Sequence, residues 1–274
     1  MKQTGKHHAL PSVPRTFRPV LEELAHGAGA ILRRHFNRPL RIRKKPGAGI
    51  VTDADHAAET YLLKAILRKF PESSIITEES GEFRRSDELV WFLDPLDGTT
   101  NFAHGFPWFC VSIGVWQNGV PRAGAVYQPV TDELFLAERG RGAWLNGKRI
   151  GVSTERKLGD ALLGTGFYYY RGAELRREIA TFQQLSQAAR AIRRPGSAAL
   201  DMACVAAGRY DGFWERGLSS WDVAAGIVLV QEAGGKVTDY AGQPADPFGG
   251  ECIATNGALH RPLLERIRRA ERQR

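Results

Sequence analysis

The chain reads Leu89-Val-Trp-Phe-Leu-Asp94-Pro-Leu-Asp97-Gly-Thr-Thr-Asn-Phe102 about a third of the way along its 274 residues. The first part is a continuous apolar run, which predicts a strand buried on both faces, as in layered α/β proteins. Pro95 cannot extend a strand ladder, so we expect the chain to leave the sheet there. Asp94 and Asp97 would then emerge where a buried strand ends, a position at which α/β proteins place ligands.

The residues after these two carboxylates predict an anion site. Gly98 lets the backbone approach a ligand closely, and Thr99 and Thr100 can cap a following helical turn, whose free amides bind anions. Because carboxylates repel an anion such as phosphate, the two can share a site only with cations between them. Oxygen ligands without His or Cys nearby favour Mg²⁺ over zinc. Asp-Pro and Asp-Gly are also common in plain turns, so this motif alone leaves a structural role open.

Two further acidic places strengthen the metal interpretation. Glu78 and Glu79 follow a short apolar strand at 74–77, and Asp222 stands at the start of an apolar helix that opens near Trp221. Carboxylates at strand ends and at a helix start, all flanked by buried segments, can converge on one site.

The pattern around this stretch predicts a mixed α/β (α+β) sandwich. Apolar residues at helical spacing predict helices, and apolar runs beside turn residues predict strands, several of them in hairpins. The helices are expected at 20–36, from Asp53 or Asp55 to Pro71, within 173–190, at 198–207, from near Trp221 and from near Ala258. The strands are expected at 74–77, 89–93, 110–116, 120–127, 133–138, 161–166, 191–194, 212–215 and 236–239.

For the domain organisation we expect a basic, flexible leader over 1–18 and two halves, 19–155 and 156–274, packed together as one catalytic unit. No apolar stretch is long enough to span a bilayer, and the first residues lack the hydrophobic segment of a secretory signal. The three cysteines, Cys110, Cys204 and Cys252, are far apart. This spacing disfavours a disulfide framework and a zinc site and suits a reducing cytoplasm.

The formal charge of +8 is concentrated at the ends of the chain. Residues 1–45 hold 11 Lys/Arg and 2 Asp/Glu, and residues 259–274 hold six Arg and two Glu, so the middle is mildly acidic. The basic ends could bind RNA, DNA or an acidic partner through ionic contacts. We favour the other interpretation, in which they are a solvated helix face and a loose leader.

The stretch 94–102, with Glu78-Glu79-Ser upstream and Trp221-Asp222-Val-Ala-Ala-Gly downstream, resembles the inositol monophosphatase family of Mg²⁺-dependent, lithium-sensitive phosphatases. The resemblance runs from about Val20 to Ala258, with the motifs in the family's order. It implies a layered α/β/α/β/α fold and a homodimer.

The resemblance also implies the metal ligands. Glu78, Asp94 and the backbone carbonyl of Leu96 would hold a first Mg²⁺. Asp94, Asp97 and Asp222 would hold a second. Asp55 and Glu79 match positions of a third, weaker metal or of its water shell.

Other matching positions are expected to contact the substrate. Gly98 and Thr99 match the phosphate-binding and water-positioning places, where Asp97 and Asp222 also face the substrate. The residues expected to face the sugar or polyol are Gly196, Ser197, Ala198 and Glu215, although Glu215 could instead pair with Arg216. Lys44 matches a lysine near the active site. The family often has an acidic residue where this chain has Gly49, which implies a looser loop.

The expected activity is hydrolysis of a small phosphomonoester. A metal-activated water, oriented by Glu78 and Thr99, would attack phosphorus in line, and the second metal would stabilise the leaving oxygen. We expect myo-inositol 1-phosphate as the substrate, with histidinol phosphate, fructose 1,6-bisphosphate and 3′-phosphoadenosine 5′-phosphate as alternatives within the family. An alternative of another class is a regulatory role, in which the chain binds RNA or the transcription machinery.

Overall fold

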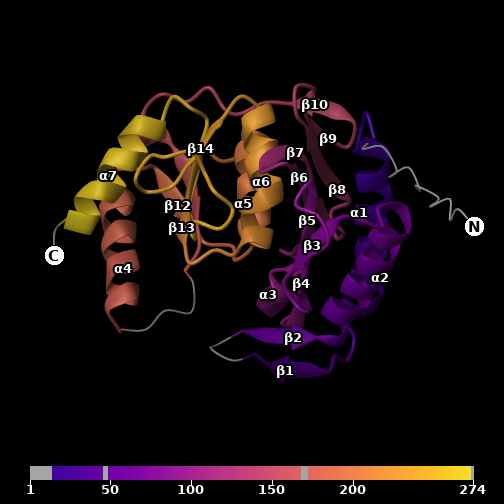
Figure 1. The fold of residues 1–274 in the computed structure, drawn as a ribbon. Helices are drawn as coiled ribbons and strands as arrows, with labels where there is room; N and C mark the ends of the chain where they lie inside the picture. Colours follow the sequence, from indigo (N-terminus) through magenta and orange to yellow (C-terminus); the bar gives the residue numbers. More distant parts are fainter. Residues whose placement is uncertain (1–13, 46–48, 168–171, 273–274) are drawn as a thin grey trace, which may run out of the picture.

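The computed structural model describes residues 14–45, 49–167 and 172–272. The elements form five layers, in which two sheets alternate with three pairs of helices (Figure 1). This arrangement confirms the predicted α/β/α/β/α sandwich. Within the described residues, no helix combines the length and the apolar character that crossing a bilayer requires.

The first sheet has eight strands in the order β10-β9-β8-β7-β6-β5-β3-β4. From β5 onward it is an antiparallel meander, and only the pair β3–β5 is parallel. Its strands are β3 (Ser74–Thr77), β4 (Gly81–Phe83), β5 (Leu89–Asp97), β6 (Cys110–Gln117), β7 (Val120–Gln128), β8 (Glu133–Glu138), β9 (Gly142–Leu145) and β10 (Lys148–Ile150). The predicted hairpin at 110–127 is therefore confirmed.

Helices α1 (Arg18–His35) and α2 (Asp53–Lys69) cover the outer face of this sheet (Figure 1). Phe17 is fully buried in the core beneath them, and the Thr16 hydroxyl donates a 2.7 Å hydrogen bond to Glu138. The expectation of a flexible leader up to residue 18 is thus wrong for residues 16–18, because they pack against the body. Residues 1–13 of that leader lie outside the described residues.

The N-cap of α2 precedes both predicted positions, by one and by three residues. Its N-cap is Thr52, not Asp53 or Asp55, and Asp55 completes a capping box by accepting the Thr52 backbone N–H. A Thr followed three residues later by an acidic side chain is a known capping arrangement, which the sequence analysis overlooked.

Two helices, α5 (Ala198–Ala206) and α6 (Ser220–Glu232), fill the space between the sheets. Helix α6 lies close to the first sheet because two strand residues lack side chains. A Cβ at Gly114 would lie 2.7 Å from Ala224 Cβ, and a Cβ at Gly124 would lie 2.7 Å from the Ala225 carbonyl. This close approach sets the position of the α6 N-terminus.

The second sheet has five strands in the order β12-β11-β13-β15-β14. They are β11 (Leu162–Thr165), β12 (Ala191–Arg193), β13 (Gly212–Arg216), β14 (Lys236–Thr238) and β15 (Glu251–Thr255). Strand β15 was not predicted, although it lies inside the sheet and pairs with both β13 and β14.

Helices α4 (Gly172–Ser186) and α7 (His260–Arg272) cover the outer face of the second sheet (Figure 1). Helix α7 contributes Leu263 and Ile267 to the core, both fully buried. The basic C-terminal helix is therefore part of the folded body and not an appended tail.

A small hairpin of β1 (Ile42–Lys44) and β2 (Ile50–Thr52) projects at one end of the molecule (Figure 1). Strand β2 leads directly into α2 and packs against the short helix α3 (Thr99–Ala103). All three residues of β1 are exposed.

Candidate active site

A cavity of about 400 Å³ is lined by residues from both halves of the chain. The end of β5, the starts of α5 and α6, and part of β13 all contribute to it. The predicted site residues that line it are Glu78, Asp94, Leu96, Asp97, Gly98, Thr99, Gly196, Ser197, Ala198, Glu215 and Asp222. Three other predicted residues, Lys44, Asp55 and Glu79, do not line it.

The end of β5 carries a bulge that turns its acidic residues toward this cavity. The strand continues through Pro95 to Asp97, so the expectation that the chain leaves the sheet at Pro95 is wrong. Instead, Asp94 pairs with Ser112 and Asp97 pairs with Cys110, which leaves one extra residue on β5 between the two pairs. Such a bulge accommodates proline and changes where the following side chains point.

Asp94 is the most deeply buried of the cavity carboxylates, with 2% of its surface exposed. The Leu96 N–H donates a 2.9 Å hydrogen bond to its Oδ1 atom. Burial raises the pKa of Asp94 well above its usual value, and the charges of Glu78, Asp97 and Asp222 raise it further. These acids repel one another, which is the electrostatic state that a bound cation relieves.

Asp97 is held in place by the start of α5. The Ser197 hydroxyl donates to Asp97 Oδ2 at 2.7 Å, and the Ala199 N–H donates to the same atom at 2.8 Å. Ser197 is also the N-cap of α5 and is almost fully buried. Burial nevertheless raises the pKa of Asp97 to about 6, although these hydrogen bonds lower it. Ser197, predicted to face the sugar, thus also orients a carboxylate.

Asp222 occupies the first turn of α6. The Ser219 N–H donates to its Oδ2 atom at 2.7 Å, as part of a capping box. A carboxylate is favoured at a helix N-terminus, so the helix positions this residue. Burial raises its pKa well above the usual value, and Asp97 and Glu78 add to the shift.

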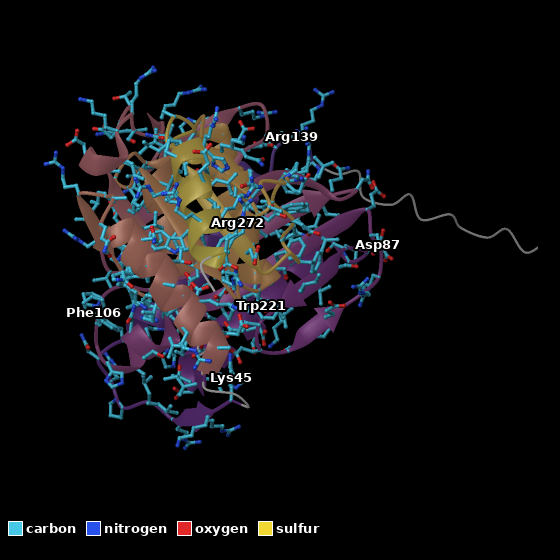
Figure 2. All side chains as sticks on the ribbon, turned by 90° about the vertical axis from the view of Figure 1, so that its left-hand side faces the viewer. Lys45, Asp87, Phe106, Arg139, Trp221 and Arg272 are labelled. Carbon is cyan, nitrogen blue, oxygen red and sulfur yellow. The ribbon has the colours of Figure 1, made fainter. Side chains whose placement is uncertain are left out.

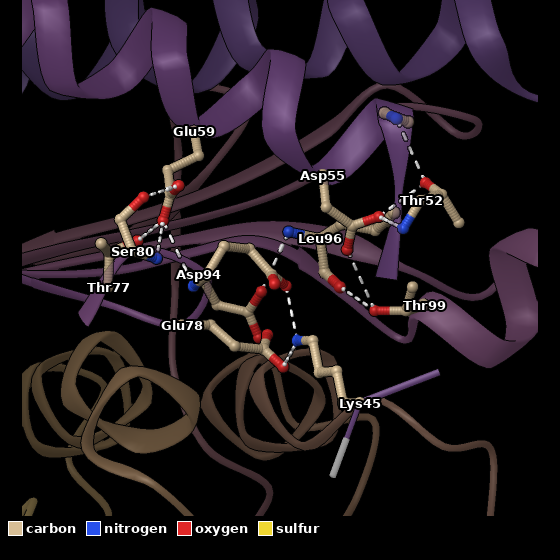
Figure 3. A network of polar contacts seen from close by, with 12 residues as sticks. Lys45, Thr52, Asp55, Glu59, Thr77, Glu78, Ser80, Asp94, Leu96 and Thr99 are labelled. Carbon is tan, nitrogen blue, oxygen red and sulfur yellow. Dashed lines mark hydrogen bonds and ion pairs between the residues drawn. The ribbon is translucent and has the colours of Figure 1, made fainter. Parts of the chain in front are cut away.

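Gly98 links β5 to α3, and Thr99 is the first residue of α3. Gly98 has φ +93°, and a Cβ there would lie 2.8 Å from the Trp108 carbonyl, so only glycine fits. The Thr99 hydroxyl lies 3.0 Å from the Leu96 carbonyl and 3.2 Å from Asp55 Oδ1 (Figure 3). Thr99 therefore lines the cavity, and the Leu96 carbonyl and Asp55 fix the orientation of its hydroxyl.

Asp55 supports this wall from outside the cavity. It is fully buried and accepts the N–H and the hydroxyl of Thr52 at 2.9 and 2.6 Å. Burial raises its pKa to about 6. Its hydrogen bonds place it where it orients Thr99.

Lys45 takes the place that the sequence assigned to Lys44 (Figure 3). Its Nζ atom donates to Glu78 Oε1 at 2.7 Å and to Glu79 Oε1 at 2.6 Å, and it lines the cavity, whereas Lys44 is exposed on β1. Successive residues of an extended chain point to opposite sides, so a shift of one residue exchanges the two lysines. Burial lowers the pKa of Lys45, but the two glutamates outweigh burial and raise it overall. Burial raises the pKa of Glu79 to about 7.

Glu215 and Arg194 line another part of the cavity. Burial raises the pKa of Glu215 to about 8, Asp97 adds to this shift and Arg194 opposes it. A Cβ at Gly166 would overlap the Glu215 carboxylate. The Glu215 side chain therefore packs directly against the backbone of Gly166, the residue that follows β11. The alternative pairing of Glu215 with its neighbour Arg216 does not occur.

Three further residues belong to this region and stand in none of the motifs. Lys45 was hidden by the neighbouring Lys44, and Arg194 lies in no acidic motif. Asp201 on α5 is 1% exposed behind the cavity wall, and burial followed by the charge of Glu215 raises its pKa well above the usual value. An Asp inside an otherwise apolar helix was the available signal.

Residues 14–272 match the sequence profile of the inositol monophosphatase family. The chain belongs to this family. The acidic motifs that suggested the resemblance are the ones that the fold brings to one cavity.

Similar proteins cover nearly the whole chain. An inositol-1-monophosphatase of Synechocystis is 44% identical over 94% of this chain and 90% of its own length. A protein of Pseudomonas aeruginosa named Nus factor SuhB is 43% identical over 89% of this chain and 92% of its own length.

Solved structures show the same fold. The inositol monophosphatase of Anabaena (Nostoc) has a TM-score of 0.82 at 44% identity, covering 92% of this chain and 96% of its own. The extragenic suppressor protein SuhB of Bartonella henselae has a TM-score of 0.87 at 40% identity, covering 91% and 97%.

Inositol monophosphatases are metal-dependent phosphoric monoester hydrolases that generally use Mg²⁺, and lithium sensitivity is a feature of the family. The donor set of this cavity fits that ion, because it consists of buried carboxylates and a carbonyl without His or Cys ligands. Among the described residues, no three acidic, His or Cys side chains are yet close enough together to hold one ion. An ion that binds Glu78 has to compete with Lys45 for its carboxylate.

Proposed function

We propose that this inositol monophosphatase family member hydrolyses a small polyol phosphate, with myo-inositol 1-phosphate as the first candidate. The observation that carries the proposal is that Glu78, Asp94, Asp97 and Asp222, from separate segments, line the same cavity as Glu215. A cluster of repelling acids suits cations and phosphate, and Glu215 suits a ligand rich in hydroxyls. The names of the relatives support the same substrate class.

We assign the metal ligands as the family resemblance implies. Glu78, Asp94 and the Leu96 carbonyl would hold one Mg²⁺, and Asp94, Asp97 and Asp222 a second. Asp55 and Glu79 would serve a third ion through its water shell, in keeping with their position behind the wall. Bound Mg²⁺ supplies positive charge for the phosphate and lowers the pKa of a coordinated water.

The chain's own residues would orient the reaction. Glu78 accepts a proton of the attacking water once Lys45 has moved away, and the Thr99 hydroxyl fixes the direction of that water. Ser197 holds Asp97, and the capping box of α6 holds Asp222, so both carboxylates are fixed in orientation before a ligand binds. Such preorganisation is the main source of catalysis in phosphoryl transfer.

The remaining lining residues would bind the substrate. The Gly98 backbone and Thr99 approach the phosphate, while Glu215 accepts a hydrogen bond from a hydroxyl of the polyol. Gly196 and Ala198 bring backbone close to the ring without adding bulk.

The test is phosphate release from a panel of phosphomonoesters with Mg²⁺, with and without Li⁺. The panel includes histidinol phosphate, fructose 1,6-bisphosphate and 3′-phosphoadenosine 5′-phosphate beside myo-inositol 1-phosphate. We expect the inositol ester to be preferred, EDTA to abolish release and Li⁺ to inhibit it. A clear preference for another ester would reassign the substrate, and EDTA-resistant release would overturn the metal assignment.

We further propose a cytoplasmic homodimer. The described cysteines, Cys110, Cys204 and Cys252, are all free and buried, which suits a reducing compartment. Phe106 beside α3 is 50% exposed and would be covered in a dimer (Figure 2). Light scattering coupled to size exclusion tests the dimer, and a monomer at micromolar concentration would contradict it.

A second candidate is a regulatory role with the transcription machinery, favoured by the relatives named Nus factor SuhB. Deleting residues 259–274 would not test it cleanly, because Leu263 and Ile267 belong to the core. Substitution of exposed residues, followed by a transcription assay with the purified protein, is the appropriate experiment. Unchanged transcription in the presence of the protein would count against this role.

A further inference from the structure

We propose that the end of α1 and the β1–β2 hairpin bind single-stranded RNA through its phosphates. We call this region the basic hairpin surface, and its residues are Arg33, Arg34, Arg38, Arg41, Arg43 and Lys44. The biological purpose of such RNA binding rests on the regulatory role proposed above. The residues that form the surface are separate from those that line the phosphatase cavity.

The six cations of the basic hairpin surface are all exposed. None of them forms an ion pair or a side-chain hydrogen bond with any other described residue. Elsewhere, exposed cations of this chain often have a partner, for example Arg190 with Asp160 and Arg261 with Glu265. The basic hairpin surface therefore carries positive charge that the described fold does not neutralise.

The sequence also keeps acidic residues out of this region. Between Glu23 and Asp53 there is no Asp or Glu, although acidic residues are frequent in the rest of the chain. A solvated helix face normally mixes both signs of charge. A long stretch of one sign is instead the footprint of a polyanion site.

The fold brings the two parts of this surface to the same end of the molecule. Phe36, just after α1, packs against Phe102 and Phe109 with ring centroids 5.5 and 4.8 Å apart. Strand β2 packs against α3, the helix that contains Phe102. Figure 2 shows nitrogen-tipped side chains pointing away from the body at this end, below Lys45.

The composition of the surface favours RNA over an acidic protein. Five of its six cations are arginines, whose planar guanidinium binds phosphate in a bidentate manner and stacks on unpaired bases. The described hairpin residues, 42–44 and 49–52, include no Trp or Tyr of the kind that anchors protein interfaces, and their large exposed hydrophobic side chain is Ile42. Strands of three residues span only about 10 Å, too short to follow the groove of a duplex.

The test compares two variants with the same loss of charge. R38Q/R41Q/R43Q alters the basic hairpin surface, and R266Q/R269Q/R272Q removes three exposed arginines from α7. The probe is a fluorescein-labelled oligouridine of about 16 nucleotides, followed by anisotropy between about 50 and 200 mM salt. We expect the hairpin variant to bind RNA at least about tenfold more weakly. Each phosphate contact contributes roughly 0.7 to the slope of log affinity against log salt, so removing three contacts should make that slope shallower by about 2. The α7 variant should bind like the unaltered protein.

Equal losses in both variants would overturn the proposal, because they would show a response to net charge alone. Absence of RNA binding by the unaltered protein would overturn it as well. If a fluorescent polyglutamate bound through the hairpin arginines and RNA did not, the surface would belong to an acidic protein. Thermal midpoints and phosphate release serve as controls for folding, since none of the substituted residues lines the cavity. A negative result would leave the phosphatase proposal intact.

Discussion

Lys45 Nζ lies 2.7 Å from Glu78 Oε1, so the chain places a cation of its own against a proposed metal ligand. The same ammonium lies 2.6 Å from Glu79, whose side chain is 4% exposed. A metal ion that binds Glu78 has to replace this contact. The ion pair of Lys45 with Glu78 therefore competes with metal binding at this carboxylate.

Substituting Lys45 should strengthen Mg²⁺ binding. In Lys45→Gln the competing ion pair is absent, and a loss of about 1.4 kcal/mol from the metal-free state corresponds to about tenfold tighter binding. Isothermal titration calorimetry with Mg²⁺ measures this directly. Lys44→Gln removes the same charge from the exposed neighbour and should leave the affinity unchanged. Weaker Mg²⁺ binding by Lys45→Gln would show that the ammonium assists the metal instead of competing with it.

Asp94→Asn should abolish activity and stabilise the metal-free protein. Asp94 is shared by both proposed metals, so we expect turnover to fall by about three orders of magnitude or more. Without metal, the buried charge of Asp94 is repelled by its neighbours, and removing it should raise the free energy of unfolding by about 1–2 kcal/mol. Phosphate release and urea unfolding in EDTA measure the two effects. Near-normal Mg²⁺-dependent turnover would refute the ligand assignment.

The sequence predicted the architecture well where each element carries its own signal. The apolar run of β5, the turn at Asn118-Gly119 and the helical spacing of α1 each specify local structure without help from distant residues. Strand β15 lacked such a signal. Its five residues follow a glycine pair, and four of them are buried because α5, α6 and α7 pack against the strand.

The sequence predicted the acidic residues of the candidate site, but it did not predict the basic residues around them. Asp94, Asp97 and Asp222 stand in motifs, and their shared cavity follows from the family resemblance. The sequence favours Lys44 as readily as Lys45, because a shift of one residue decides which side chain faces inward and only the hairpin register settles that. Arg194 comes from a loop that only the packing of the two halves brings to the cavity.

Glu178 on α4 should make stability depend on pH independently of the active site. It is 1% exposed, and burial raises its pKa to about 7, because Arg216 only partly compensates. The native state therefore binds this proton more tightly than the unfolded state, whose carboxyl titrates near 4.5. Ionising the buried Glu178 carboxyl therefore lowers the free energy of unfolding. This loss of stability is absent below about pH 4.5, grows as the pH rises and is complete above about pH 7.

Glu178→Gln should remove that loss of stability. Relative to the unaltered protein, its free energy of unfolding should be about equal near pH 4.5 and about 3 kcal/mol higher at pH 8. Arg216 keeps Glu251 and Glu271 at 3.2 and 3.1 Å, so it is not left unpaired. Urea unfolding across this pH range measures the difference. A constant difference at all pH values would mean that packing, not ionisation, causes the effect.

Glu215→Gln should separate recognition of the polyol from chemistry at phosphorus. In assays above pH 8, where Glu215 is ionised, we expect the KM for myo-inositol 1-phosphate to rise roughly tenfold, because a hydroxyl loses its charged acceptor. Turnover of p-nitrophenyl phosphate, which has no hydroxyls to recognise, should change less than about twofold on the same reasoning. Gly166→Ala offers an independent variant, since its Cβ would overlap the Glu215 carboxylate and displace it, so the same selective rise in KM is expected. Equal losses on both substrates in both variants would place Glu215 in the catalytic machinery and remove it from substrate recognition.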